Sequence, residues 1–217
     1  MIVEHLTVGP LGCTCTILGD ETTGAAIVID GGDDVDLIAE RLAVHGLKPT
    51  ALVHTHAHID HIGALGQLRD RCGGAGLLHP ADLPLYQTLA LQAQFLGLAV
   101  APPIVTIDGD LRDGDTLRAG ALRLDVIHTP GHTPGSTSFA VNTGEETLLF
   151  TGDTLFRQSV GRIDLGGTTM EELVGSIRTK LFAFADDAVV VPGHGPATTI
   201  GHERRTNPYA AIGKDRS

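Results

Sequence analysis

Residues 50–61 read TALVHTHAHIDH, in which an apolar, strand-like run leads into four histidines and one aspartate. Neutral imidazole and ionised carboxylate are common protein ligands for divalent metal ions. Residues two apart lie on one face of a strand, and a tight loop can turn several consecutive side chains toward one point. Burying so many titratable groups at one strand end would be costly without a cation. The stretch therefore predicts a strand that delivers metal ligands, and the candidates are His56, His58, Asp60 and His61.

Three later segments have the same form, in which an apolar run is followed by Gly or Pro and then by a metal-binding side chain. They are VIHTPGHTPGS with His132, LLFTGD with Asp153 and VVVPGHG with His194. Ligands on loops at strand ends, drawn from both halves of the chain, converge when two sheets pack together. The set is too large for one tetrahedral ion. It suits two metals about 3.5–4 Å apart that share a bridging carboxylate and a bridging water.

The remaining histidines have a structural interpretation, because a lone histidine at a strand end is more often hydrogen-bonded than bound to metal. We expect His54 to belong to the strand and to hydrogen-bond nearby, and we expect a similar role for His128. The other histidines with this interpretation are His5, His45, His79 and His202. Cys13 and Cys15 are expected to share one face of a strand and to pack within a sheet.

Composition and charge narrow the class of protein. The 217 residues are enough for one sizeable core, and we expect a single domain over residues 1–217. The chain has 15 basic and 26 acidic residues, a formal net charge of −11, so nucleic-acid binding is disfavoured. We see no apolar run of the roughly 20 residues that span a membrane, no signal-peptide pattern, and no disulfide framework among the three cysteines. We expect a cytoplasmic protein that acts on a small molecule, and its oligomeric state is open.

Hydrophobic periodicity and turn residues indicate alternating strands and helices in the first half of the chain. The strands are expected at residues 2–8, 13–18, 25–30, 50–56 and 76–80. The helices are expected at residues 33–47, 62–73 and 81–98. Asp33 or Asp34 is the expected cap of the first helix, and Gly46 is its stop signal.

The second half predicts four successive strands within residues 116–153, then a helix at 169–184 and a strand at 188–195. Thr168 or Thr169 is the expected cap of that helix. Two β-rich halves that both contain helices indicate two sheets packed face to face, with the helices outside.

The motifs THAHIDH, TPGHTPGS, GDTLF, SVGRID and PGHGP occur in this order between residues 52 and 196. With them the chain resembles the metallo-β-lactamase superfamily, and within it the short glyoxalase II-like hydrolases. The segment ERRTNPY near the end of the sequence also resembles the closing segment of that short branch. The resemblance implies the αββα metallo-β-lactamase sandwich, an α/β fold of two packed mixed sheets flanked by helices, with metals at one edge. It also implies a first metal on His56, His58 and His132, a second on Asp60, His61 and His194, and Asp153 as the bridge.

Some departures and shared features bear on the activity. Full-length glyoxalase II binds glutathione through basic side chains of a helical C-terminal domain, whereas only 217 − 194 = 23 residues follow His194 here. We therefore expect thioester chemistry with weak recognition of glutathione. Zinc β-lactamases usually have Cys at the position of Asp153, which argues against antibiotic hydrolysis. Persulfide dioxygenases, which use one iron, share several of these motifs and also resemble the chain at Gly161, Arg162 and Asp164.

The leading hypothesis is thioester hydrolysis of the hydroxyacylglutathione hydrolase (glyoxalase II) type with two divalent metals, zinc or else iron or manganese. Two cations lower the pKa of a bridging water toward 7, which yields a hydroxide nucleophile. Asp60 is the expected catalytic residue, as ligand and proton acceptor. Arg157, Arg162 and Tyr86 are candidate substrate contacts, with a structural pair to Asp164 and a core position for Tyr86 as the alternatives. Hydrolysis of a lactone or another ester, and iron-dependent persulfide oxidation, stay open as other activities.

Overall fold

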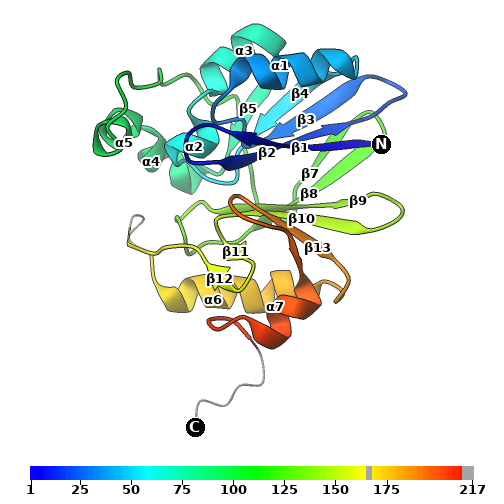
Figure 1. Cartoon of the computed structure of the whole chain (residues 1–217), viewed down its shortest axis with the longest axis vertical. Helices are drawn as coiled ribbons and strands as arrows, with labels where there is room; N and C mark the ends of the chain where they lie inside the picture. The colour runs from blue at the N-terminus through cyan, green and yellow to red at the C-terminus, as the bar shows by residue number, and fades with distance from the viewer. Residues whose placement is uncertain (165–167, 212–217) are drawn as a thin grey trace.

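Two β-sheets pack face to face, and helices cover their outer faces (Figure 1). The computed structural model describes residues 1–164 and 168–211. The covering helices are α1 (Val35–Val44) and α3 (Leu65–Cys72) on the first sheet, and α6 (Met170–Thr179) and α7 (Ile200–Thr206) on the second. This architecture is the α/β sandwich that the sequence predicts.

The first sheet has six strands in chain order, β1-β2-β3-β4-β5-β6. They are β1 (Ile2–Val8), β2 (Cys13–Gly19), β3 (Ala25–Ile29), β4 (Lys48–Val53), β5 (Ala75–Leu78) and β6 (Gly109–Asp110). Strands β1 to β3 pair antiparallel, and β3 to β6 pair parallel. Parallel neighbours need crossover connections, which α1 and α3 supply. The pleat places Cys13 and Cys15 together in the buried layer, as predicted.

The second sheet has the order β14-β13-β10-β9-β8-β7. Its strands are β7 (Thr116–Ala119), β8 (Leu122–His128), β9 (Thr137–Asn142), β10 (Thr147–Gly152), β13 (Val189–Pro192) and β14 (Thr198–Thr199). Strands β7 to β10 confirm the four strands predicted within residues 116–153. Strands β10 and β13 are parallel, and α6 crosses between them. A small hairpin of β11 (Leu155–Phe156) and β12 (Ser159–Val160) follows β10.

Apolar side chains form three buried layers. Between the sheets lie Ile27, Ile29, Val53, Leu124, Phe139 and Phe150. The second layer is formed by the inner faces of α1 and α3, which contribute Ile38, Leu42, Leu65 and Leu68. The third is formed by Leu173 and Ile177 of α6 together with Leu149 and Leu181. Each fully buried side chain of this kind stabilises the fold by about 1.5–3 kcal/mol relative to an exposed one, so both sheets are held on both faces.

The predicted helix at residues 81–98 is broken, which corrects the sequence-based expectation. A 3₁₀ turn at Pro80–Asp82 is followed by α4 (Leu83–Tyr86) and by α5 (Leu89–Phe95). Thr88 lies between α4 and α5, and its Oγ1 donates to a backbone carbonyl three residues earlier at 2.7 Å. Such a local side-chain bond competes with the backbone bonding of a continuous helix. A short helix α2 (Ile59–Ile62), which was not predicted, precedes α3.

The helix ends agree with the sequence in two of three cases. Thr169 caps α6 by accepting a backbone N–H of the first turn at 3.2 Å. Gly46 follows α1 with a φ of 65°, as its role as a stop signal predicts. The capping prediction for α1 was wrong, because Asp34 at the N-cap makes no capping bond. With a φ of 48° it accepts instead from the backbone N–H of Gly9, in the turn between β1 and β2.

The helices are short. Helices α1 and α6 have 10 residues each, whereas a membrane span needs roughly 20. Within residues 1–164 and 168–211, no helix has both the length and the apolar character to cross a membrane. The assignment of residues 1–217 to a single domain stays a prediction.

Candidate metal centre

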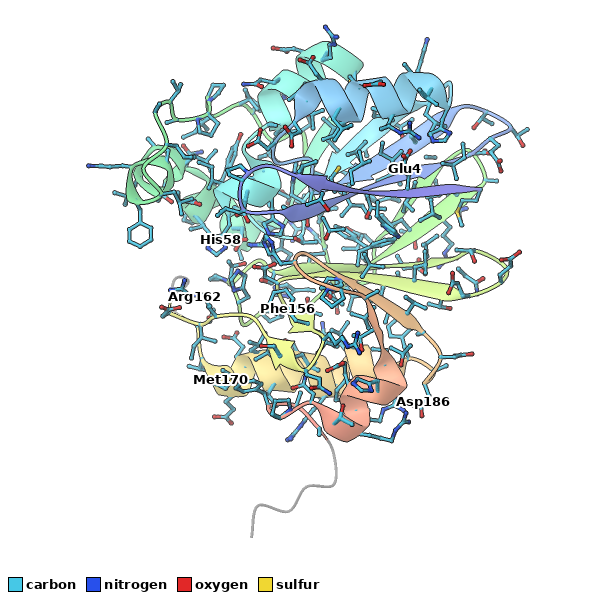
Figure 2. All side chains as sticks on the ribbon, viewed as in Figure 1. Glu4, His58, Phe156, Arg162, Met170 and Asp186 are labelled. Atoms are coloured by element: carbon cyan, nitrogen blue, oxygen red, sulfur yellow. The ribbon has the colours of Figure 1, made fainter. Side chains whose placement is uncertain are left out.

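Four loops at one edge of the sandwich carry the seven predicted ligands. Each loop begins where a strand ends, after β4, β8, β10 and β13. Figure 2 labels His58 on this side of the molecule, between the two sheets, with Arg162 close by. Residues that are far apart in the sequence therefore meet at the edge where the sequence predicts a metal site.

The first ligand cluster consists of three imidazole nitrogens. His58 Nδ1 lies 2.9 Å from His56 Nε2 and 2.9 Å from His132 Nε2. The other nitrogens of two rings are already bonded, since His132 Nδ1 donates to the Arg162 carbonyl at 2.8 Å and His56 Nδ1 lies 3.0 Å from Thr55 Oγ1. A proton on each of these Nδ1 atoms leaves the Nε2 lone pair directed at the common centre.

The second ligand cluster consists of one carboxylate and two imidazoles. His194 Nε2 lies 3.1 Å from Asp60 Oδ2 and 3.3 Å from His61 Nε2. His61 Nε2 lies 3.6 Å from the same carboxylate oxygen. The other nitrogen of His61, Nδ1, lies 3.0 Å from Asp30 Oδ2 and donates to it. This bond turns Nε2 toward the second cluster.

Asp153 lies between the two clusters. Its Oδ2 is 3.7 Å from His132 Nε2 in the first cluster. Its Oδ1 is 3.5 Å from His61 Nε2 and 3.8 Å from His194 Nε2 in the second cluster. Oδ1 is buried and has no hydrogen-bond partner among the residues that the structure describes. A buried carboxylate oxygen without a donor is costly, and a bridging position between two cations would satisfy it.

Electrostatics keep the first cluster neutral. Burial lowers the pKa of His56 well below its ordinary value, and neighbouring imidazoles add to this effect. Burial, together with a neighbouring imidazole, lowers the pKa of His58 to about 3. Burial lowers the pKa of His132 as well, although the charge of Asp153 opposes this shift. Since the neutral ring is the metal-binding form, the three nitrogens are ready to accept an ion at neutral pH.

Electrostatics favour positive charge in the second cluster. Burial opposes a cationic His61, but Cys13, Asp30 and Asp153 raise its pKa. The pKa of Cys13 is itself raised to about 11 by burial, so the two carboxylates exert the effect at neutral pH. A hydrogen bond to the neighbouring carboxylate raises the pKa of His194 as well. A proton or a divalent ion is therefore favoured at this position, and the two compete.

Asp60 is ionised in this setting. Burial alone would raise its pKa, but the hydrogen bond with His194 and the charge of His61 lower it below the ordinary range. The carboxylate is thus in the form that can bind a cation, and its role as a metal ligand stays a prediction. Its further role as proton acceptor stays a prediction.

Sequence reasoning missed Asp30, which positions His61. The Asp30 carboxylate is buried and accepts from the Thr55 backbone N–H and from Thr55 Oγ1, both at 2.7 Å, in addition to His61 Nδ1. Its φ of 54° lies in the left-handed region, where a non-glycine residue is strained. The segment AAIVID, an apolar run followed by a carboxylate, has the form of the ligand segments and could have indicated it.

Sequence reasoning also missed Asp82, which joins two ligand loops. Its fully buried carboxylate accepts from the Ala57 backbone N–H at 3.0 Å, from Thr133 Oγ1 at 2.8 Å and from the Gly135 backbone N–H at 2.6 Å. Ala57 lies between two ligands of the first cluster, and Thr133 follows the third. The sequence gives no indication of this role, because its local pattern indicates only that Asp82 lies in the first turn of the helix predicted at residues 81–98.

The histidines interpreted as structural make the expected contacts. The prediction that His54 belongs to the strand was wrong by one residue, because β4 ends at Val53. The predicted hydrogen bond is present, since His54 Nδ1 donates to the His61 carbonyl at 2.9 Å. Burial lowers the pKa of His54 to about 4. His128 Nε2 donates to the Pro134 carbonyl at 2.9 Å, and the ring stacks on His79 with 4.0 Å between centroids.

The three candidate substrate residues have different positions. Arg162 is exposed and forms a two-fold pair with Asp164 at 2.9 and 2.7 Å, the structural alternative considered for it. Arg157 is exposed and lines a shallow cavity near Thr199, apart from the seven ligands. Tyr86 is buried, and its hydroxyl accepts from a backbone N–H, so it takes the core position rather than the pocket wall. Substrate contact by the two arginines stays a prediction.

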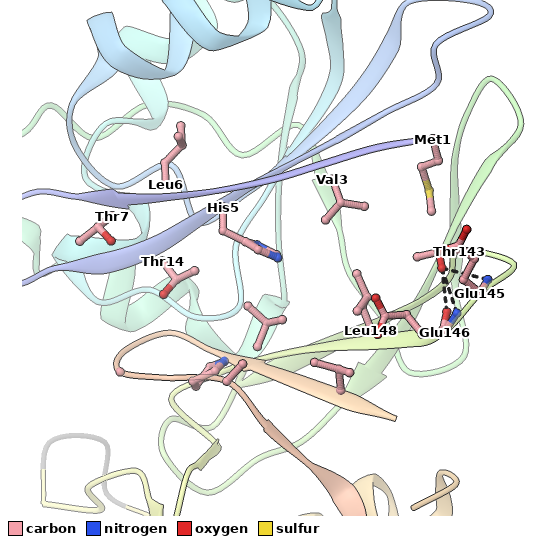
Figure 3. Close-up of a pocket in the computed structure, with 15 residues that line it drawn as sticks. Met1, Val3, His5, Leu6, Thr7, Thr14, Thr143, Glu145, Glu146 and Leu148 are labelled. Atoms are coloured by element: carbon pink, nitrogen blue, oxygen red, sulfur yellow. Dashed lines mark hydrogen bonds between the residues drawn. The ribbon is translucent and has the colours of Figure 1, made fainter. Parts of the chain in front are cut away.

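Two larger cavities differ in their relation to the metal centre. One of about 740 Å³ lies between β1 and the strands β10 and β13, and none of the seven ligands lines it (Figure 3). The other, of about 390 Å³, includes Asp60 in its wall. The smaller cavity is therefore the one that adjoins the chemistry.

The ligand order and the sandwich identify the family. Residues 8–194 match the sequence profile described as the metallo-beta-lactamase superfamily. The chain belongs to this superfamily. Membership and the ligand set together support a metal-dependent enzyme of the metallo-hydrolase type.

Several known proteins are similar over their whole length. Hydroxyacylglutathione hydrolase GloC of Haemophilus influenzae is 35% identical over 213 residues, which cover 96% of this chain and 98% of that protein. The crystal structure of BLEG-1 B3 metallo-beta-lactamase has a TM-score of 0.87 and 33% identity, over 97% of this chain and 100% of that one. The crystal structure of TTHA1623 in a di-iron-bound form has a TM-score of 0.83 and 39% identity, over 95% and 100%.

Proposed function

We propose that this protein hydrolyses thioesters of the hydroxyacylglutathione type with two divalent metal ions. The observation that carries the proposal is the position of Asp153, with one carboxylate oxygen facing each ligand cluster. The buried oxygen, Oδ1, has no hydrogen-bond donor within residues 1–164 and 168–211. The similarity to a hydroxyacylglutathione hydrolase supports the substrate class.

The residues present fit two ions. One would be held by His56, His58 and His132, the other by Asp60, His61 and His194, with Asp153 between them. We propose zinc for both positions, because zinc is commonly bound by imidazole nitrogens and carboxylate oxygens. The di-iron form of a similar structure makes iron the first alternative to zinc.

The side chains of this protein have defined roles in the proposed reaction. When bound, two divalent ions would polarise the thioester carbonyl and lower the pKa of a water molecule. Asp60, which is ionised, would accept a proton from the attacking water. Asp30 holds His61, and Asp82 holds two ligand loops, so the ligand geometry is set before substrate arrives. A thiolate leaves readily, so the site needs no strong general acid.

Within residues 1–164 and 168–211, no cluster of basic side chains at the predicted metal centre is evident as a binding site for glutathione. Its net charge is −11, and Arg162 is already paired with Asp164. We therefore propose turnover of S-D-lactoylglutathione with a KM of roughly 1 mM or above. Added salt should lower this KM, because it screens the repulsion between an acidic enzyme and an anionic substrate.

The test pairs metal content with turnover. Purified protein is analysed for metal and assayed with S-D-lactoylglutathione at two ionic strengths, and with glutathione persulfide under oxygen. Two ions per chain with thioester hydrolysis would support the proposal. One iron with oxygen uptake would replace it by persulfide oxidation. A fully metal-loaded protein that hydrolyses no thioester would contradict it.

Hydrolysis of β-lactams is the second candidate. The similarity to a structure named as a B3 metallo-β-lactamase favours it, at 33% identity and full coverage of that chain. This similarity weakens the sequence argument against antibiotic hydrolysis, which rests on Asp153 standing where Cys is usual. Nitrocefin hydrolysis, measured beside thioester hydrolysis on the same metal-loaded sample, ranks the two activities by kcat/KM.

A further inference from the structure

We propose that the cavity of about 390 Å³ beside Asp60 binds an uncharged, apolar chain of the thioester substrate. The inference rests on the proposed thioester activity and specifies the class of substrate. The cavity lies between the β1–β2 turn, the start of helices α2 and α3, and the segment at residues 96–103 that follows α5. Its volume is in the range of small-molecule sites, about 300–1,000 Å³.

The cavity adjoins the reacting centre through one residue. Asp60 lines the cavity and also contributes Oδ2 to the second ligand cluster, 3.1 Å from His194 Nε2. Ile59, the residue before it, lines the cavity as well. Helix α5 and the chain that follows it lie beside α2 at this edge (Figure 1). A substrate whose carbonyl is at the metal centre can therefore extend a chain into the cavity.

The cavity walls expose apolar side chains that a bound chain would cover. Leu11, Leu98 and Val100 line it and are 48%, 40% and 80% exposed. Exposed apolar surface gathered in one concave region is uncommon on a soluble protein and marks binding sites. Burial of this surface by an alkyl chain would be favourable by the ordinary hydrophobic effect.

The charge of the cavity excludes an anionic group. Asp33 and Asp60 line it, and within residues 1–164 and 168–211 no Lys, Arg or His does. In the metal-loaded protein the bound cation would offset the charge of Asp60, so Asp33 is the carboxylate that would repel an anionic group of the substrate. The glutathione moiety carries such groups, so the cavity favours an uncharged chain over glutathione.

The chain could belong to the acyl half or to the thiol half of the ester, and one assay separates them. Metal-loaded protein is tested with N-acetylcysteamine thioesters of acetyl, butyryl and hexanoyl groups, and with acetyl thioesters of ethanethiol, butanethiol and hexanethiol. We expect KM to fall about threefold to fourfold for each added CH₂ in one series. That series identifies the half that enters the cavity. Equal KM values throughout both series would overturn the proposal.

A matched pair of variants tests the location. Leu98→Asp places a charge in the cavity wall, whereas Leu91→Asp changes a residue that is 64% exposed on α5 and does not line the cavity. Leu98→Asp should raise the KM of the six-carbon substrate at least about tenfold and remove the dependence on chain length, with metal content unchanged. Leu91→Asp should behave as the wild type. Equal effects of the two variants would place the chain elsewhere.

A gain of function tests the charge. Gln67 lines the cavity and is exposed. An adipoyl thioester, which ends in a carboxylate, should have a kcat/KM about tenfold or more below that of the hexanoyl thioester. Gln67→Lys should narrow this gap by raising the rate on adipoyl thioester. A wild-type preference for the adipoyl ester would overturn the proposal.

Binding without turnover separates this proposal from the proposed function. Calorimetric titration with hexanamide, which the enzyme cannot use as a thioester, should give binding to the wild type and to Leu91→Asp but not to Leu98→Asp. If no thioester is hydrolysed and hexanamide still binds in this pattern, the cavity proposal is supported and the proposed thioester hydrolysis is contradicted. If thioesters are hydrolysed but hexanamide does not bind, the cavity proposal fails alone. If KM does not depend on chain length, and sedimentation shows a dimer for the wild type and Leu91→Asp but a monomer for Leu98→Asp, the cavity residues would instead form an interface with a second copy of the protein.

Discussion

The two ligand clusters of the metal centre are held in different ways. In the first, a backbone carbonyl and a hydroxyl orient two of the three neutral imidazoles, those of His132 and His56, and Asp82 connects the ligand loops. In the second, a buried carboxylate, Asp30, orients His61 and raises the local preference for positive charge. The first cluster thus depends on loop position and the second on charge. Asp153 is the group that belongs to both.

The largest expected effect comes from breaking the link between the clusters. Asp153→Ala should lose one of two metals and lower kcat/KM by about 10³-fold, because both ions lose their shared anion. Metal analysis and thioester kinetics measure it. Asp187→Ala, an exposed carboxylate, is the control. A variant that keeps two metals and a near-wild-type rate would remove Asp153 from the centre.

Asp82→Ala tests the dependence of the first cluster on loop position. It leaves three donors without their acceptor, so we expect the free energy of unfolding to fall by about 1–3 kcal/mol. Affinity for one metal should fall by about 100-fold, measured by cobalt titration of the metal-free protein. We expect the cobalt spectrum to show that the weakened site is the first cluster, which has three nitrogen ligands. Loss of the carboxylate-containing site instead would reverse the comparison.

Asp30→Asn tests the dependence of the second cluster on charge. The amide keeps the size of the side chain but removes the negative charge behind His61. We expect about tenfold weaker binding of the second metal in the same cobalt titration. The first metal should weaken less, because Asp30 reaches His56 only through Thr55 Oγ1. Equal weakening of both metals would show that the clusters are not held independently.

His54→Asn separates a structural histidine from the ligands beside it. His54 donates to the His61 carbonyl. Within residues 1–164 and 168–211, it belongs to none of the groups of side chains that could hold a metal ion. Two metals should remain, and the midpoint of urea unfolding should fall by the equivalent of about 1 kcal/mol. A decrease of one metal ion per chain would make His54 a ligand.

The smallest effect is expected at the rim of the centre. Arg162→Ala removes an exposed pair with Asp164, and such pairs contribute little to stability because solvent screens them. KM for S-D-lactoylglutathione should change by less than about twofold. A large increase in KM would restore Arg162 as a substrate contact.

Much of the centre follows from local sequence patterns. HTHAHIDH places four candidate ligands after one strand, and the structure joins them with His132, Asp153 and His194 as expected. Strands β7 to β10 were also predictable, because Gly, Asn and Pro mark their turns. The helix at 81–98 was not, because its break depends on where the Thr88 hydroxyl bonds.

The sequence by itself determined the types of the candidate ligands, their order and the strands that precede them. Those features are local, since apolar runs form strands and polar residues after Gly or Pro form loops at their ends. Tertiary structure alone decided which carboxylates support the ligands, since Asp30 and Asp82 act on residues that are 25 or more positions away. It also decided that Tyr86 is buried and that Asp60 borders an apolar cavity. Burial and long-range hydrogen bonds depend on how the sheets and loops pack, and no single stretch of the chain encodes that packing.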